Sequence, residues 1–170
     1  MMNRSTKSAT TPRRRSRGVI AVELALVSIP LIMMSLSVFE YARAMYLYNT
    51  LVKATRDGAR YLSGFDPTDA SNYPTANALN RVIYGYHPVP SGTQPLVPGL
   101  TASMVGICDR VSSSACPSQT FINVPAGASG NVNLVKVQIT GYTFVPLVPG
   151  VSRLLSVTFD PISTTMRQVL

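Results

Sequence analysis

The chain has 170 residues, of which 46% are hydrophobic and only 13% are charged, and its formal net charge is +8. Six of its 15 Lys and Arg residues lie in the first 17 positions, which contain no acid, so the sequence from Val19 onward carries nine basic against seven acidic side chains. The basic character therefore belongs to an N-terminal tail. A nucleic-acid-binding surface would need Lys and Arg clustered on the folded part of the chain, and we expect no nucleic-acid partner.

A long apolar run follows the basic tail. Residues 19–39 contain one charged side chain, Glu23, and one proline. About 20 apolar residues at about 1.5 Å each cross a hydrocarbon core of about 30 Å, so we expect a transmembrane helix over residues 19–40. A secretory signal has a shorter apolar core and a small-residue cleavage motif after it, neither of which fits here. By the positive-inside rule, the basic tail stays in the cytoplasm and the later part of the chain is exported.

The carboxylate of Glu23 is unusual inside such a run. A charge within a bilayer costs on the order of 3 kcal/mol, so it is a candidate functional group. One interpretation places Glu23 near the cytoplasmic interface, where it reaches toward Arg17 or lipid headgroups. The other assumes cleavage after Gly18, which creates an α-amine on Val19 one helical turn from Glu23. This amine could pair with Glu23 of the same or a neighbouring copy and set the register of a helix bundle.

The helix is expected to continue beyond the membrane over residues 41–64, because Gly64 and Pro67 are the first stop signals. Side chains at alternating steps of four and three residues form one stripe along this part. Two partners are possible for the stripe, the protein's own globular domain or another subunit, and both could apply at different turns. The stripe comprises Tyr41, Met45, Tyr48, Val52, Thr55, Ala59 and Leu62.

Residues 65–170 are expected to form an exported domain with a short helix over Thr75–Tyr84, followed by strands. In residues 135–140, Val135, Val137 and Ile139 alternate with polar residues, which predicts one buried and one wet face. The same alternation is expected for Leu155, Val157 and Phe159. Strand-like segments also occur at residues 100–107 and 119–124. The predicted fold class is α+β, with a long N-terminal helix packed on a small antiparallel sheet.

The two cysteines, Cys108 and Cys116, are expected to form a disulfide in the oxidising exported space, closing the loop between the first two strands. A metal site is not expected, since the cysteine spacing is not that of a zinc motif and His87 is the only histidine. The exported acids form no catalytic motif, and no glycine-rich phosphate loop is present. We therefore expect neither an enzyme nor a cofactor.

Three segments together resemble TadE-like proteins, which belong to the type IV pilin-like class. The segment "GVIAVELALV" from Gly18 corresponds to the processing site and the start of the mature helix of that family, with glutamate as the fifth mature residue. "EYAR" (Glu40–Arg43) and "ATRDGARYL" (Ala54–Leu62) correspond to two further family segments. The final strands and "STTMR" (Ser163–Arg167) resemble the end of the family. Leu24 stands where many members have Phe or Tyr.

The resemblance implies a minor pilin or pseudopilin of a tight-adherence (Tad/Flp) pilus. It implies that a prepilin peptidase removes the leader, residues 1–18, by cutting between Gly18 and Val19, and that Val19 and Glu23 act in subunit assembly. The implied partners are the peptidase, other pilin subunits, the inner-membrane assembly platform and membrane lipid, with the C-terminal domain in the periplasm. An uncleaved, membrane-anchored periplasmic binding module is the alternative.

Overall fold

The structure is a computed structural model that describes residues 16–127, 130–148 and 156–168. The chain divides into two compact units, Met1–Tyr41 and Ala42–Leu170. Helix α1 (Ser16–Leu62) contributes residues to both. It begins at Ser16, before the predicted start at residue 19, and it ends at Leu62, shortly before the predicted stop signals Gly64 and Pro67. The leader residues 1–15 lie outside the described part of the chain.

The N-terminal unit is described from residue 16 and consists of the first part of α1. In the described residues, the helix Gly18–Leu62 is the one helix long and apolar enough to cross a membrane. The hydroxyl groups of three serines in this helix are hydrogen-bonded to its own backbone. Ser28, Ser35 and Ser37 each donate to the backbone carbonyl four residues earlier, at 2.7–2.9 Å. Such back-bonding allows hydroxyl groups to lie within an apolar environment.

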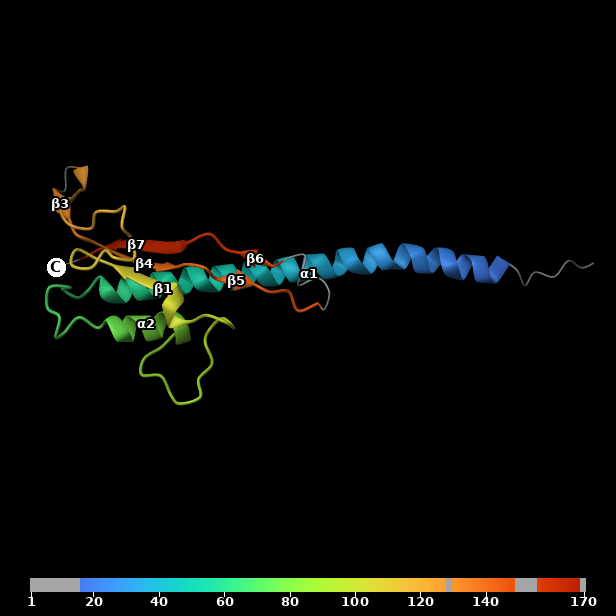
Figure 1. Ribbon diagram of the computed structural model, residues 1–170, viewed down its shortest axis with the longest axis horizontal. Helices are drawn as coiled ribbons and strands as arrows, with labels where there is room; N and C mark the ends of the chain where they lie inside the picture. The colour runs from blue at the N-terminus through green and yellow to red at the C-terminus, as the bar shows by residue number, and fades with distance from the viewer. Residues whose placement is uncertain (1–15, 128–129, 149–155, 169–170) are drawn as a thin grey trace, which may run out of the picture. The chain divides into compact units, whose positions relative to one another are not determined.

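The C-terminal unit contains the second part of α1, one further α-helix, a short 3-10 helix and seven strands among the described residues. Figure 1 shows how these elements follow one another. The main sheet has three antiparallel strands in the order β1-β4-β7, and each of the pairs β2-β3 and β5-β6 forms a small sheet of its own. The elements after α1 are α2 (Thr75–Tyr84), the short 3-10 helix η1 (Ala102–Met104), β1 (Val105–Cys108), β2 (Val124–Pro125), β3 (Asn131–Val132), β4 (Leu134–Ile139), β5 (Thr143–Phe144), β6 (Val157–Thr158) and β7 (Ile162–Arg167). This arrangement confirms the predicted α+β class.

The core of this unit lies where α1 meets α2 and the inner face of the main sheet. On β4, Val135, Val137 and Ile139 are fully buried, as their alternation predicts. The hydroxyl groups of Thr55 on α1 and Thr164 on β7 lie 3.0 Å apart, which ties the helix to the edge of the sheet. The remaining core is apolar and comes from Leu47, Leu51, Ala54, Ala59, Leu62, Ala78, Val82, Ile83, Val97, Leu100, Tyr142, Phe144 and Ile162.

Helix α2 has the bounds predicted from the sequence, and it buries Ala78, Val82 and Ile83. The helical pattern of Thr75–Tyr84 predicts that Leu79 points inward together with Val82 and Ile83, but Leu79 is only partly buried and packs at the margin of the core. The helix ends at Gly85, which has a φ of 84° and donates its N–H to the carbonyl of Arg81. This left-handed conformation favours glycine, so Gly85 stops the helix as a C-cap.

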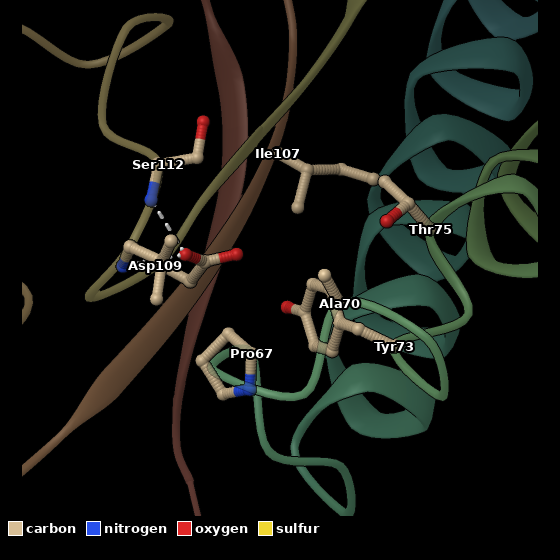
Figure 2. A pocket seen from close by; sticks show the side chains of 8 residues that line it. Pro67, Ala70, Tyr73, Thr75, Ile107, Asp109 and Ser112 are labelled. Atoms are coloured by element: carbon tan, nitrogen blue, oxygen red, sulfur yellow. Dashed lines mark hydrogen bonds between the residues drawn. The ribbon is translucent and has the colours of Figure 1, made fainter.

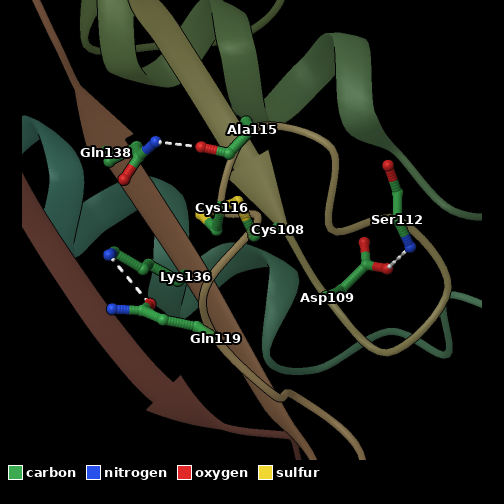
Figure 3. The surroundings of a disulfide bond; sticks show 8 residues. All are labelled: Cys108, Asp109, Ser112, Ala115, Cys116, Gln119, Lys136 and Gln138. Carbon is green, nitrogen blue, oxygen red and sulfur yellow. Dashed lines mark hydrogen bonds between the residues drawn. A yellow bond between two sulfur atoms is a disulfide. The ribbon is translucent and has the colours of Figure 1, made fainter.

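The outer face of the main sheet is less exposed than the alternation predicts, because the disulfide loop covers it (Figure 3). Cys108 and Cys116 are joined by a disulfide and pack with Phe121. Lys136, expected on a wet face, is only 9% exposed, and its Nζ donates to Gln119 Oε1 at 3.0 Å. Period-two patterns identify a polar face, but they do not show that a distant loop supplies its hydrogen-bond acceptors.

Three expected strands are shorter than predicted, and β3, β5 and β7 were not predicted. Of residues 100–107, residues 102–104 form η1, and the strand β1 begins only at Val105. Of residues 119–124, only Val124 lies in a strand, β2. In the later segment, Leu155 lies outside the described residues, and Val157 in β6 is half-exposed, so the alternation expected there is wrong at Val157. The family-like tail Ser163–Arg167, for which no strand is predicted, belongs to β7, which pairs with β4 over its full length.

A glycine sets the closest approach between α1 and its neighbours. A Cβ added at Gly58 would lie 2.5 Å from Val82 Cγ2 on α2 and 3.6 Å from Val137 Cγ1 on β4. Val82 is fully buried, and its branched side chain has few rotamers with which to move aside. The glycine of the family-like segment Ala54–Leu62 is therefore a packing requirement of this unit.

We expect Gly58→Ala to destabilise the C-terminal unit. Overpacking a core costs about 1–3 kcal/mol, and the better helix propensity of alanine offsets up to about 1 kcal/mol of this. Urea unfolding of the variant should show a lower midpoint. In a double-mutant cycle with Val82→Ala, the two substitutions should together cost less than the sum of their separate costs. Additive costs would contradict the contact.

Candidate processing and assembly site

The residues predicted to act in processing and assembly lie on one face of the first turns of α1. Val19 and Glu23 are exposed, and together with Gly18, Val22 and Leu26 they line a single hollow on the helix surface. The spacing of four residues brings the backbone nitrogen of Val19 and the side chain of Glu23 to the same face, one turn apart. The Glu23 carboxylate is thus surrounded on this face by apolar side chains.

Gly18 has no packing reason to be glycine in this structure. A Cβ added there would meet nothing within 4 Å, in contrast to Gly58. Within a helix, glycine costs about 1 kcal/mol relative to alanine. The cost is not offset by a contact or turn among the described residues, which favours an explanation in which another molecule recognises this position.

The predicted stripe on the second part of α1 divides into two halves. Thr55, Ala59 and Leu62 are buried in the protein's own core, and Val52 packs at its margin. The first half is exposed, to different degrees, at Tyr41, Met45 and Tyr48. The ring of Tyr48 nevertheless meets that of Phe159 edge-on, with centroids 5.6 Å apart. The protein's own domain therefore covers the later turns, and the earlier turns keep a surface available to another partner.

Sequence reasoning missed a second stripe that the domain buries more deeply. Leu47, Leu51, Ala54 and Gly58 follow the same steps of four and three residues and face the core. The signal was present, since two leucines and then the small residues Ala54 and Gly58 recur at helical spacing. The aromatic residues of the neighbouring stripe gave an equally regular pattern, and periodicity alone does not rank two such patterns.

A pocket of about 250 Å³ lies between the connection after α1 and the disulfide loop (Figure 2). Asp109, which is 3% exposed, lines it, and its Oδ1 accepts the N–H groups of Val111 and Ser112 at 2.8 Å each. Tyr73 faces this carboxylate from the other side. Burial, and then the nearby Asp109 charge, raises the pKa of Tyr73, so its hydroxyl stays protonated. Neither residue was predicted from the sequence.

An ion pair joins the same two loops outside the pocket. Arg110 of the disulfide loop bonds to Asp66 of the connection after α1. Hydrogen bonds from the Thr68 hydroxyl and the Thr68 N–H, followed by the bond from Arg110, lower the pKa of Asp66 to about 2. The pKa of Asp69 is lowered in the same way, mainly by the Ser71 hydroxyl and the Asn72 amide. These carboxylates are bonded in local turns.

The other predicted features have no catalytic arrangement around them. Among the described residues, no three His, Cys, Asp or Glu side chains lie close enough to hold a metal ion. His87 is exposed, in the connector after α2. The pocket at Asp109 contains a carboxylate and a phenol but brings no cysteine or histidine to them.

Acid should weaken the C-terminal unit through Asp66. Because folding lowers its pKa from 3.8 to about 2, the ionised carboxylate stabilises the fold above about pH 4, and this stabilisation is lost as the pH falls toward 2. Urea midpoints measured across this range should fall less steeply in Asp66→Asn than in the unmodified chain. Asp160→Asn, which removes an exposed acid from the same unit, is the control and should retain the original slope.

Comparison with known proteins bears on the helix. Residues 18–60 match the model of a family described as TadE-like protein. Comparisons with curated proteins and with solved structures gave no match. The matched range begins at the glycine of the predicted processing site and ends within the segment that contains Gly58. The match confirms, over residues 18–60, the TadE-like resemblance seen in the sequence. Residues 18–60 of this protein thus form a TadE-like segment.

Proposed function

We propose that this protein is a minor pilin or pseudopilin of a tight-adherence pilus and acts in the initiation, assembly or tip of the filament. The observation that carries the proposal is the shared face of Gly18, Val19 and Glu23 at the start of a TadE-like, membrane-length helix. A cleavage site next to a lone intramembrane carboxylate serves little purpose in a simple anchor, whereas both features are needed if the new N-terminus becomes part of a subunit contact.

Processing is proposed to occur at the cytoplasmic surface of the inner membrane. The basic leader would remain in the cytoplasm, and a prepilin peptidase would cut between Gly18 and Val19. The empty surroundings of Gly18 support this role, because the peptidase could approach the backbone there without displacing a side chain of this chain. The C-terminal unit would lie in the periplasm, where its disulfide can form.

Assembly is proposed to depend on the charge pair that cleavage creates. The α-amine of Val19 and the Glu23 carboxylate would compensate each other in a low-dielectric bundle of pilin helices. Pairing between neighbouring copies or subunits would fix their axial register, since a shift by one turn leaves two charges buried without a partner. The partners are therefore other pilin subunits, delivered by an inner-membrane assembly platform.

A membrane-anchored periplasmic binding module is the second candidate. The pocket at Tyr73 and Asp109 favours it, because a deeply buried carboxylate and a protonated phenol line one space of about 250 Å³. In this case the leader would remain attached, and Glu23 would be an interfacial residue without a role in assembly. Identification of the mature N-terminus separates the two candidates.

One prediction of the proposed function concerns the mature N-terminus. Co-expression with a prepilin peptidase should yield a product that begins at Val19, and intact mass and N-terminal sequencing would identify it. Gly18→Val should remain uncut, while its fold is retained, because a Cβ added at Gly18 meets none of the described residues within 4 Å. Expression without the peptidase is the control and should leave the leader in place. An uncut chain in every case would support the anchored module.

Another prediction of the proposed function concerns Glu23. Glu23→Ala should be processed normally but should fail to support pilus assembly, since the amine of Val19 then lacks its partner. Leu24→Ala is the matched control, because it truncates the neighbouring side chain, which does not line the Glu23 hollow. Filaments would be counted by electron microscopy on cells that carry each variant as the only copy of the protein. Normal filament numbers with Glu23→Ala would refute the pairing role.

A further inference from the structure

Exposed apolar side chains gather at the beginning of the C-terminal unit. Met45, Tyr46 and Tyr48 lie on α1, while Val145 and Val157 belong to the β5-β6 region; we name these five residues the collar. Tyr46 is 70% exposed and Val145 is 55% exposed, so their side chains are not part of the domain core.

Contacts with α1 place the β5-β6 region at the level of these helix residues. The guanidinium of Arg43 lies 5.0 Å from the ring centre of Phe144, and its NH1 donates to the carbonyl of Val145 at 3.3 Å. Val157 pairs with Phe144 across the two strands. Farther along, the ring of Tyr48 meets that of Phe159. The collar therefore combines helix and hairpin residues at one height along α1.

The collar does not have the geometry of a helix–helix contact. Successive residues of an α-helix are about 100° apart around its axis, so Tyr46 and Tyr48 point in nearly opposite directions. One partner helix would cover a single stripe and leave the other tyrosine exposed. A planar environment that surrounds the helix at one height would contact both tyrosines and the hairpin together.

The exposed surface of α1 changes character immediately after the collar. From Asn49 to the end of the helix, every exposed side chain is polar, namely those of Asn49, Lys53, Arg56, Asp57 and Arg60. Before the collar, the apolar run ends at Phe39, less than two turns from Met45. Side chains on a helix lean toward its N-terminus, so those of Tyr46 and Tyr48 lie nearer the start of this unit than their own Cα atoms do.

From these observations we infer that the collar contacts the bilayer surface and lies in its headgroup layer. Tyrosine is enriched at this depth because its ring is apolar and its hydroxyl is wet. The inference rests on the proposed membrane anchoring of residues 19–40, and it adds that the exported domain itself contacts lipid through Val145 and Val157. Before assembly, the domain would then be held against the membrane by its own hairpin.

Tryptophan fluorescence provides a direct test, since the chain contains no tryptophan. The full chain would be reconstituted in phosphatidylcholine vesicles with single substitutions Tyr46→Trp and Val145→Trp in the collar. Phe39→Trp reports on the anchor. Ile122→Trp is the matched control, because Ile122 is 49% exposed but lies away from the collar. It follows Phe121, whose carbonyl accepts the N–H of Leu134 at the start of β4. The collar hairpin follows Ile139 at the other end of that strand.

We expect both collar tryptophans to lose fluorescence when the lipids carry bromine near the headgroup end of the acyl chains, and Ile122→Trp to retain it. Phe39→Trp should also be quenched. If Phe39→Trp is quenched while both collar variants behave like Ile122→Trp, the inference is wrong and the anchor stands, which leaves the collar for contact with other subunits. Absence of quenching at all sites would overturn the inference and the proposed anchoring together.

Discussion

Close packing of the last turns of α1 against α2 and β4 is the constraint on which the C-terminal unit depends. Gly58 permits this approach, and Thr55 adds a polar link to β7. The helix is thus both the continuation of the apolar segment and the centre of the folded domain. A change that separates α1 from β4 removes the main core, because α2 and the sheet have their largest buried residues at this same contact.

The disulfide loop performs a second structural task on the opposite face of the sheet. The cystine packs with Phe121, and Gln119, in the segment that follows Cys116, provides the acceptor for Lys136. The same loop reaches the connection after α1 through Arg110. A three-stranded sheet with one helix-covered face would otherwise expose its other face, and a small domain has little other apolar surface with which to cover it.

Much of this architecture could be predicted from local patterns, and the differences have physical causes. The bounds of α1 and α2, the inward residues of β4 and the disulfide follow from periodicity, stop signals and cysteine count. Burial of Asp109 and Lys136 depends on contacts between distant segments, which no local pattern encodes. The strand β7 was missed because its residues Ser163, Thr164 and Thr165 are polar at consecutive positions, which hides the alternation expected of an edge strand. At the candidate site, the shared face of Val19 and Glu23 followed from their spacing, whereas the contrast between Gly18 and Gly58 needed three-dimensional neighbours.

The serines of the apolar segment have a consequence for how such helices would meet. Ser28, Ser35 and Ser37 each donate their hydroxyl proton to their own backbone, so they offer a neighbour no free donor. Between residues 19 and 39, Glu23 is the one charged side chain, and the serine oxygens remain only as acceptors. Contacts along the rest of the segment rely on dispersion, which changes little as one helix slides or rotates against another. Two such helices would therefore slide or rotate past each other at low cost until Glu23, the one charged position, meets a partner.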